Sequence, residues 1–135
     1  MSYRIEEIEG IGPKYAAKLS EAGIETTEAL LEKCSTPAGR KSVADATGMG
    51  ESTILKWTNM ADLMRISGIG PQYSELLKGA GVDTVKELRN RNAANLAETM
   101  KTVNDEKNFA RIAPPAGTVT KWVEAAKSMD PKITY

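Results

Sequence analysis

A gap-free internal repeat constrains this chain more than any other feature of its sequence. Residues 8–34 and residues 66–92 align at an offset of 58, and 11 of the 27 aligned positions are identical. Both copies contain glycine, isoleucine, glycine and proline in the same order, at residues 10–13 and 68–71. Self-similarity over this length indicates that each copy forms one supersecondary unit. The sequence therefore predicts two related units.

The repeat extends toward the end of the chain with a change in spacing. Trp57 corresponds to Trp122 at an offset of 65, so the second copy carries about seven extra residues, which we place within residues 101–115. The two units then cover residues 1–63 and 64–135. Because no stretch rich in glycine, serine or proline separates them, we expect the units to pack as one body.

Helix start and stop signals recur in both copies. Pro13 and Pro71 suit the first position of a helix, where the missing N–H costs nothing. Gly23 and Gly81 suit the left-handed cap that ends such a helix. Thr26 and Thr84 suit the N-cap of the next helix, and a further helix is expected to start at residues 35–37 in the first copy and at Asn92 in the second. The last helix of each unit is expected at about residues 51–63 and 118–129. Aromatic residues make up 5% of the chain and no alternating pattern is sustained, so the predicted fold class is all-α with five helices in each unit.

A glycine hairpin precedes a helix in each unit. Glycine lets the chain reverse within a few residues, and the isoleucine between the two glycines is expected to pack between helices. Small side chains leave the N–H groups of the hairpin and of the next helical turn exposed, which suits one phosphate oxygen. The phosphate-binding residues predicted from this pattern are Gly10, Ile11, Gly12, Pro13, Lys14 and Lys18 in the first hairpin, and Gly68, Ile69 and Gly70 in the second.

The second hairpin lacks the cations of the first. Gln72 stands at the position of Lys14, and Leu76 stands at the position of Lys18. The second hairpin should therefore bind anions more weakly, and a protein-facing role is expected there.

A third glycine turn is expected to close the first unit. Gly48 and Gly50 flank a methionine, and Lys56 follows within two helical turns, so these residues are predicted to assist phosphate binding. The corresponding segment of the second unit, residues 112–117, has lost this pattern.

The hairpin pattern resembles the helix-hairpin-helix motif. Each unit resembles the five-helix domains at the N-terminus of archaeal and eukaryotic recombinases, and the double unit is similar to a family of small proteins with a tandem helix-hairpin-helix (SAM-like) domain of unknown function. This resemblance covers about residues 3–130. It implies that a nucleic-acid backbone docks at the hairpin and that no bases are read.

Composition limits the possible chemistry. Lys plus Arg and Asp plus Glu each number 18, and this zero net charge argues against a high-affinity coat for nucleic acid. Residues 1–65 hold 8 basic and 10 acidic side chains and residues 66–135 the reverse, so the better-equipped hairpin lies in the more acidic half. The chain has no histidine and one cysteine, Cys34. We therefore expect no enzymatic activity, no cofactor and no bound metal.

Other conspicuous side chains are expected to be structural. Trp57 and Trp122 occupy equivalent helical positions and are predicted to pack in the core. Tyr15 and Tyr73 should pack beneath the first turn after each hairpin, and Cys34 should be an inert core thiol.

Two functions remain open from the sequence. The hairpin chemistry favours a non-catalytic module that binds the DNA phosphate backbone weakly and without sequence preference. The zero net charge and Gln72 favour a protein-interaction or scaffolding module that no longer binds nucleic acid, with an unidentified protein partner. The first residues have no apolar core for a signal peptide and no run spans a membrane, so a soluble, cytoplasmic protein without a membrane partner is expected.

Overall fold

The computed structural model describes residues 2–135, and over these residues the chain is all-helical. A short 3-10 helix, η1 (Ile5–Glu7), precedes eight α-helices: α1 (Pro13–Glu21), α2 (Thr27–Cys34), α3 (Pro37–Thr47), α4 (Glu51–Leu63), α5 (Pro71–Gly79), α6 (Val85–Leu88), α7 (Ala93–Lys107) and α8 (Ala116–Lys127). Within this part of the chain, β-type pairing is limited to one isolated antiparallel bridge between Arg4 and Thr26. The all-α prediction is confirmed.

The helices begin and end where the sequence predicts caps. Pro13 and Pro71 are the first residues of α1 and α5. Four polar side chains each accept a hydrogen bond from the amide three residues later, and these N-caps are Thr26, Thr36, Thr84 and Asn92. After α1 and α5 the chain passes through the left-handed region at Gly23 and Gly81, with φ of +84° and +92°. Local sequence thus fixes most of the helix boundaries.

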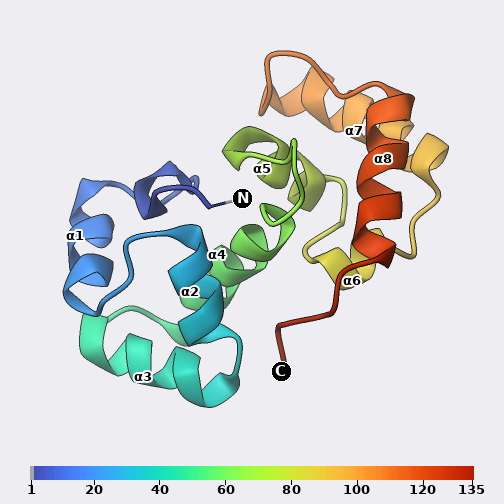
Figure 1. Ribbon diagram of the computed structural model, residues 1–135. Coiled ribbons are helices and arrows are strands. Elements are labelled where there is room, and N and C mark those ends of the chain that lie inside the picture. Colours follow the sequence, from blue (N-terminus) through green and yellow to red (C-terminus); the bar gives the residue numbers. More distant parts are fainter. Residues whose placement is uncertain (1) are drawn as a thin grey trace.

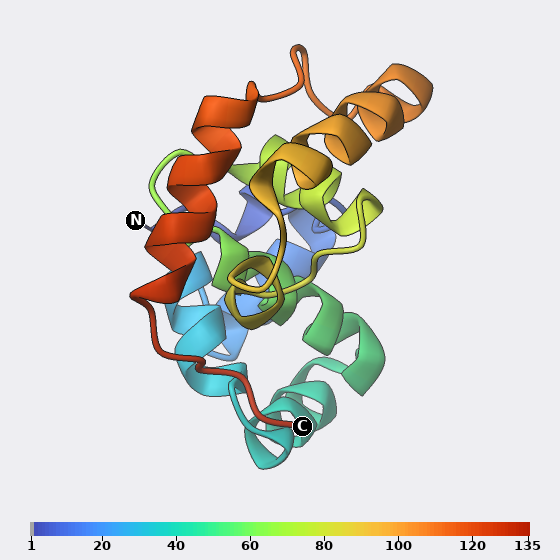
Figure 2. The same ribbon diagram turned by 90° about the vertical axis from the view of Figure 1, so that its right-hand side faces the viewer.

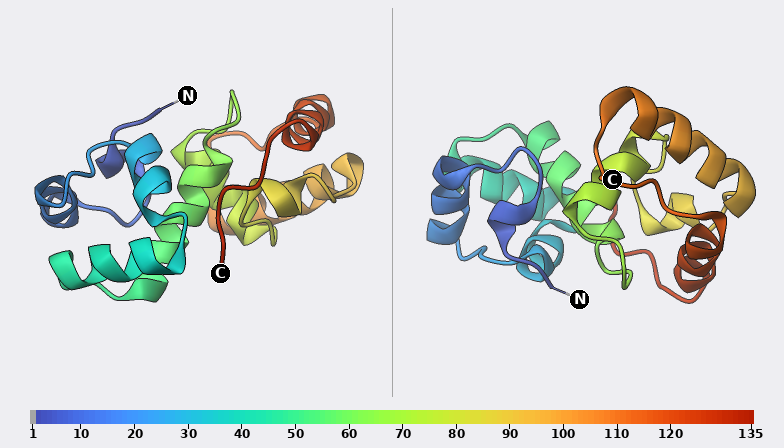
Figure 3. Two further views of the ribbon diagram at one scale, coloured as in Figure 1. Left: turned by 60° about the horizontal axis from the view of Figure 1, so that its bottom comes forward. Right: turned by 90° about the horizontal axis from the view of Figure 1, so that it is seen from above.

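Helix α4 lies between two groups of helices (Figures 1 and 3). On one side lie η1 and α1–α3, and on the other lie α5–α8. Buried apolar side chains form two clusters, one from Ile5 to Met64 and one from Leu63 to Ala126. Because Leu63 belongs to the second cluster and Met64 to the first, the end of α4 contributes to both cores.

The second half differs from the first in helix number and length. It contains four α-helices, α5–α8, so the expectation of five helices in each unit is not confirmed. Of the extra residues expected within 101–115, residues 101–107 continue α7, which has 15 residues where α3 has 11. Residues 108–115 connect α7 to α8. The division into residues 1–63 and 64–135 stays a prediction.

After α8 the chain runs back toward the first half as a non-helical segment, residues 128–135 (Figure 2). The amide of Thr134 donates to the Ser35 carbonyl at 2.7 Å. Arg40 is buried and donates to the Cys34 carbonyl at 3.0 Å and to the Thr134 carbonyl at 2.7 Å. This C-terminal segment therefore supplies part of the surroundings of a buried guanidinium in the first half.

Candidate phosphate-binding site

Tryptophan packs against the first glycine of each hairpin. Gly10 and Gly68 have φ of +94° and +95°, in the left-handed region that favours glycine. A Cβ added at Gly10 would lie 3.5 Å from Trp57 Nε1, and one added at Gly68 would lie 3.1 Å from Trp122 Nε1. Both tryptophans are 3% exposed, which confirms the predicted core packing. The two hairpins thus have the same backbone form and the same support.

The isoleucine of each hairpin is buried, as expected. Ile11 and Ile69 are 3% and 0% exposed. Their amides donate to the carbonyls of Ile8 and Ile66 at 3.0 and 3.1 Å. These contacts anchor each turn in its core and leave the flanking glycines at the surface.

The first hairpin leaves the start of α1 open. Gly12 is the N-cap of α1 and provides no side-chain cap, and a Cβ added there would meet nothing within 4 Å. The amide of Ala16 donates to the Gly12 carbonyl at 2.9 Å and begins the helical ladder. Because Pro13 has no N–H, the amides of Lys14 and Tyr15 are the donors that the first turn offers to a ligand.

A pocket brings the beginning of α1 together with the α3–α4 turn, whereas Gly10, Ile11, Gly12 and Pro13 do not line it. It has a volume of about 310 Å³ and is lined by Lys14, Tyr15, Lys18, Gly48, Met49, Gly50, Thr53 and Trp57. Gly48 ends α3 with a φ of +74°, and Gly50 is the N-cap of α4 without a side-chain cap. Two open helix starts and two lysines therefore line the same pocket. Thr53 was not predicted, although its place in the first turn after Gly50 is a signal for it.

Lys56 lies outside this pocket. On an α-helix Lys56 shares a face with Ser52, whereas Thr53 shares the neighbouring face with Trp57. Lys56 instead lines a different cavity together with Lys78 of α5. The structure therefore does not bring Lys56 together with the glycines of the α3–α4 turn, contrary to the expectation.

The N-terminal segment partly covers the second hairpin, where Gly68 is exposed and Gly70 is half-buried. A Cβ added at Gly70 would lie 3.5 Å from the Tyr3 hydroxyl oxygen, whereas the equivalent Gly12 has open space. Leu76, at the position of Lys18, is fully buried. The two hairpins therefore differ in accessibility as well as in charge. The contact of Tyr3 is long-range, so no local pattern could indicate it.

The comparison with known families covers both hairpins. Residues 9–129 match the family model described as Domain of unknown function (DUF4332). The chain belongs to the DUF4332 family. The matched region contains all eight α-helices of the described chain. Membership in a family of unknown function is thereby confirmed, and the helix-hairpin-helix and recombinase resemblances stay predictions. No curated protein and no solved structure matches the chain.

The tyrosine after each hairpin of the DUF4332 chain contacts a core tryptophan. The ring centroids of Tyr15 and Trp57 are 5.7 Å apart, and those of Tyr73 and Trp122 are 5.3 Å apart. Tyr15 is nevertheless 42% exposed, more than expected for a ring beneath the turn. It therefore forms one wall of the pocket beside Lys14.

Carboxylates before the first hairpin are partly engaged by Arg4. Its side chain pairs with Glu6, and its amide donates to the Glu7 carboxylate at 2.9 Å. Exposed pairs of this kind are weak. Glu9 is exposed beside the hairpin, so this side of the site remains acidic.

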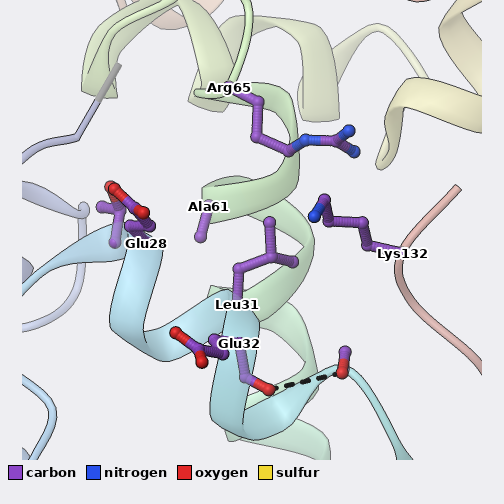
Figure 4. A pocket seen from close by; sticks show the side chains of 8 residues that line it. Glu28, Leu31, Glu32, Ala61, Arg65 and Lys132 are labelled. Carbon is purple, nitrogen blue, oxygen red and sulfur yellow. Dashed lines mark hydrogen bonds between the residues drawn. The ribbon is translucent and has the colours of Figure 1, made fainter. Parts of the chain in front are cut away.

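A larger pocket of the DUF4332 fold lies between α2, α4 and the C-terminal segment (Figure 4). Its volume is about 620 Å³, and it is lined by Thr27, Glu28, Leu31, Glu32, Ser35, Ala61, Arg65 and Lys132. Glu28 and Glu32 come from α2, and Arg65 and Lys132 come from the opposite side (Figure 4). Arg65 donates to the Asp62 carboxylate at 2.8 Å. No predicted site residue lines this pocket.

The remaining reactive group is a buried thiol. Cys34 is fully buried, as predicted, and burial raises the pKa of its thiol.

Across residues 2–135, no three His, Cys, Asp or Glu side chains gather in a position to hold a metal ion. No helix in the same range combines the length and the apolar character needed to cross a bilayer.

Proposed function

We propose that this DUF4332 protein is a non-catalytic module that binds the sugar-phosphate backbone of DNA weakly and without sequence preference. One observation carries the proposal: Lys14 and Lys18 line the same pocket as the open starts of α1 and α4. The unpaired N–H groups and the dipole at a helix N-terminus attract anions. The lysines add the charge that neutralises a phosphate.

The chemistry of the pocket favours the backbone over the bases. The candidate donors are main-chain amides and two lysines, and such groups contact phosphate without reading sequence. With this few cations, we expect two to four phosphates to be neutralised. The logarithm of affinity should then fall against the logarithm of salt concentration with a slope of roughly −2 to −4.

We infer the finer architecture from the same elements. The chain is proposed to be a tandem pair of five-helix helix-hairpin-helix units, in which the end of α4 takes the position that η1 has in the first unit. Matching φ angles at Gly10 and Gly68 and matching tryptophan contacts support this arrangement. The cover over Gly70 by Tyr3 supports a structural role for the second hairpin.

A charge reversal tests the proposal. Lys14→Glu should weaken DNA binding by a factor of about ten to a few hundred, since it removes a cation from the anion site and repels the backbone. Gln72→Glu introduces the same carboxylate at the equivalent position of the second hairpin, with a change of one charge unit where Lys14→Glu changes two, and should change binding little. Fluorescence anisotropy with labelled single- and double-stranded oligonucleotides at low salt measures both affinities.

The outcomes separate the two candidate functions. A logarithmic loss of affinity in Gln72→Glu about half as large as in Lys14→Glu, in proportion to the one and two charge units changed, would show that net charge, and not the first hairpin, controls binding. No measurable binding to DNA at low salt by the folded protein would overturn the proposal. The carboxylates that precede the first hairpin and the partly covered second hairpin would then favour the protein-interaction function.

A further inference from the structure

A second cavity connects the two halves of the molecule. It has a volume of about 270 Å³ and is lined by Ser52, Leu55, Lys56, Asn59, Met60, Leu63, Lys78 and Asp83. Ser52, Lys56 and Asn59 follow one face of α4 at intervals of four and three residues. Lys78 lies near the end of α5, and Asp83 lies in the connection between α5 and α6. The cavity is therefore formed by α4 on one side, and by the end of α5 and the connection between α5 and α6 on the other.

Two lysine side chains meet at this cavity. The pKa of Lys78 is lowered by burial first and then by the neighbouring Lys56, as expected when two ammonium groups are held close together. Neither lysine belongs to an ion pair within residues 2–135. Asp83 and Glu75 act on Lys78 in the opposite direction. The cavity is lined by two ammonium groups and the Asp83 carboxylate, and the Glu75 carboxylate of α5 also acts on Lys78.

The other groups of the cavity suit an anion. The Ser52 hydroxyl is a donor. Asn59 accepts a hydrogen bond from the Tyr135 hydroxyl through Oδ1 at 3.3 Å, and its NH2 group remains a donor. Leu55, Met60 and Leu63 form an apolar floor. Ser52 and Lys56 are exposed and Lys78 is half-buried, so an anion can reach these donors from solvent.

We propose that Lys56 and Lys78 together bind one phosphate group in this cavity. A phosphate monoester carries between −1.5 and −2 charges near pH 7 and has three strong acceptor oxygens. Two ammonium groups, each with three N–H donors, supply donors for those oxygens. Asp83 lies in the same cavity and compensates part of their charge.

The proposed site is separate from the pocket at the first hairpin. Lys56 and Lys78 do not line that pocket, and Lys14 and Lys18 do not line this cavity. The inference therefore stands whether or not the first hairpin binds DNA. The phosphate group can come from a free phosphate or from a nucleic-acid strand, and the experiment includes both.

An NMR titration of the full chain, labelled with ¹³C-lysine, tests the site. Inorganic phosphate is added at constant ionic strength maintained with sodium chloride, and the pKa of Lys78 is followed through its Cε resonance. Phosphate should raise that pKa, because an anion stabilises the charged form. A dinucleotide with one phosphodiester provides the second arm, and its weaker effect would identify a monoester as the preferred ligand.

Three variants define the result. Lys56→Gln should raise the pKa of Lys78 in the absence of phosphate and weaken phosphate binding by at least about tenfold. Lys86→Gln, which removes an exposed lysine of α6, should change neither quantity. Lys121→Gln, which removes an exposed lysine of α8, is a second control and should likewise change neither quantity.

Two results would overturn the proposal. One is no phosphate-dependent change at Lys78 up to about 50 mM, well above a Kd on the order of 1 mM. The other is a Lys56→Gln variant in which phosphate binding persists or the phosphate-free pKa of Lys78 stays the same. Either result would show that the two lysines do not act on one anion.

Discussion

Replacing Gly12 with aspartate should separate phosphate binding from folding. The φ of −81° and ψ of −179° at Gly12 are extended backbone that any residue adopts, and an added Cβ meets nothing within 4 Å. At the N-cap, the carboxylate introduced by Gly12→Asp can accept hydrogen bonds from the amides of Lys14 and Tyr15. These are the same donors that we assign to a phosphate oxygen. The variant should therefore fold more stably and bind DNA less well.

The gain in stability follows from two contributions. Aspartate is favoured over glycine at an N-cap by a few tenths of a kcal/mol, and a negative charge at a helix N-terminus adds about 0.3 to 1 kcal/mol. The sum is about 1 kcal/mol. For 135 residues, the entropy of unfolding is about 0.28 kcal/mol per kelvin, so Tm should rise by about 3 to 4 °C.

Scanning calorimetry and fluorescence anisotropy measure the two effects on the same samples. DNA affinity should fall at least about tenfold, which corresponds to about 1.4 kcal/mol. Gly70→Asp is the matched control, since it adds the same charge at the N-cap of α5. A Cβ at Gly70 lies at an ordinary van der Waals distance of 3.5 Å from the Tyr3 hydroxyl. This control should leave DNA affinity unchanged within a factor of about two.

Two results would contradict the reasoning. If Gly12→Asp binds DNA as tightly as the unmodified protein, the amides at the start of α1 do not hold the phosphate. If its Tm falls, the start of α1 is not open to a side chain.

Three further predictions concern stability. Gly39→Ala should lower Tm by about 10 °C, a loss of about 3 kcal/mol, because the added Cβ would lie 2.1 Å from a main-chain oxygen of α2. Gly117→Ala is the control: its added Cβ meets nothing within 4 Å, so Tm measured by calorimetry should shift by less than about 3 °C. Because the pKa of the Cys34 thiol is raised in the folded protein, its contribution to the free energy of unfolding is complete below the unfolded thiol pKa of about 8.5 and is lost as pH rises through the folded pKa. Denaturant midpoints should therefore fall in alkali, and a thiol reagent should label only unfolded protein. Removal of residues 130–135 should lower Tm by about 4 to 10 °C, because Arg40 loses a buried partner, and Arg40→Met should recover part of that loss in the shortened chain.

Sequence reasoning succeeded where a feature depends on residues three or four apart. The N-caps at Thr26 and Thr84 and the left-handed glycines at Gly23 and Gly81 were all predicted. Each is a local choice of backbone angle or hydrogen bond that the residue type itself favours. The repeat added the expectation that Trp57 would be buried, which is confirmed.

Sequence reasoning did not reach contacts that depend on tertiary packing. Lys56 and Lys78 line one cavity because of the way in which α5 packs beside α4. Tyr3 lies over Gly70 because of the path of the N-terminal segment. Neither contact leaves a periodic trace in the chain. The same holds for residues 128–135, which have no helical or strand pattern and are positioned by hydrogen bonds to distant residues.

The return of the C-terminal segment to Arg40 also has a consequence for synthesis on the ribosome. Thr134, whose carbonyl accepts from Arg40, follows it by 94 residues. At about 5 to 20 residues per second, the nascent first half waits on the order of 5 to 20 s for this partner. During that time the guanidinium has the Cys34 carbonyl as a partner but not the Thr134 carbonyl, so part of it must remain hydrated, because burying unsatisfied donors of a charged group is unfavourable. The first half therefore reaches its final packing only after the segment around Thr134 has been translated.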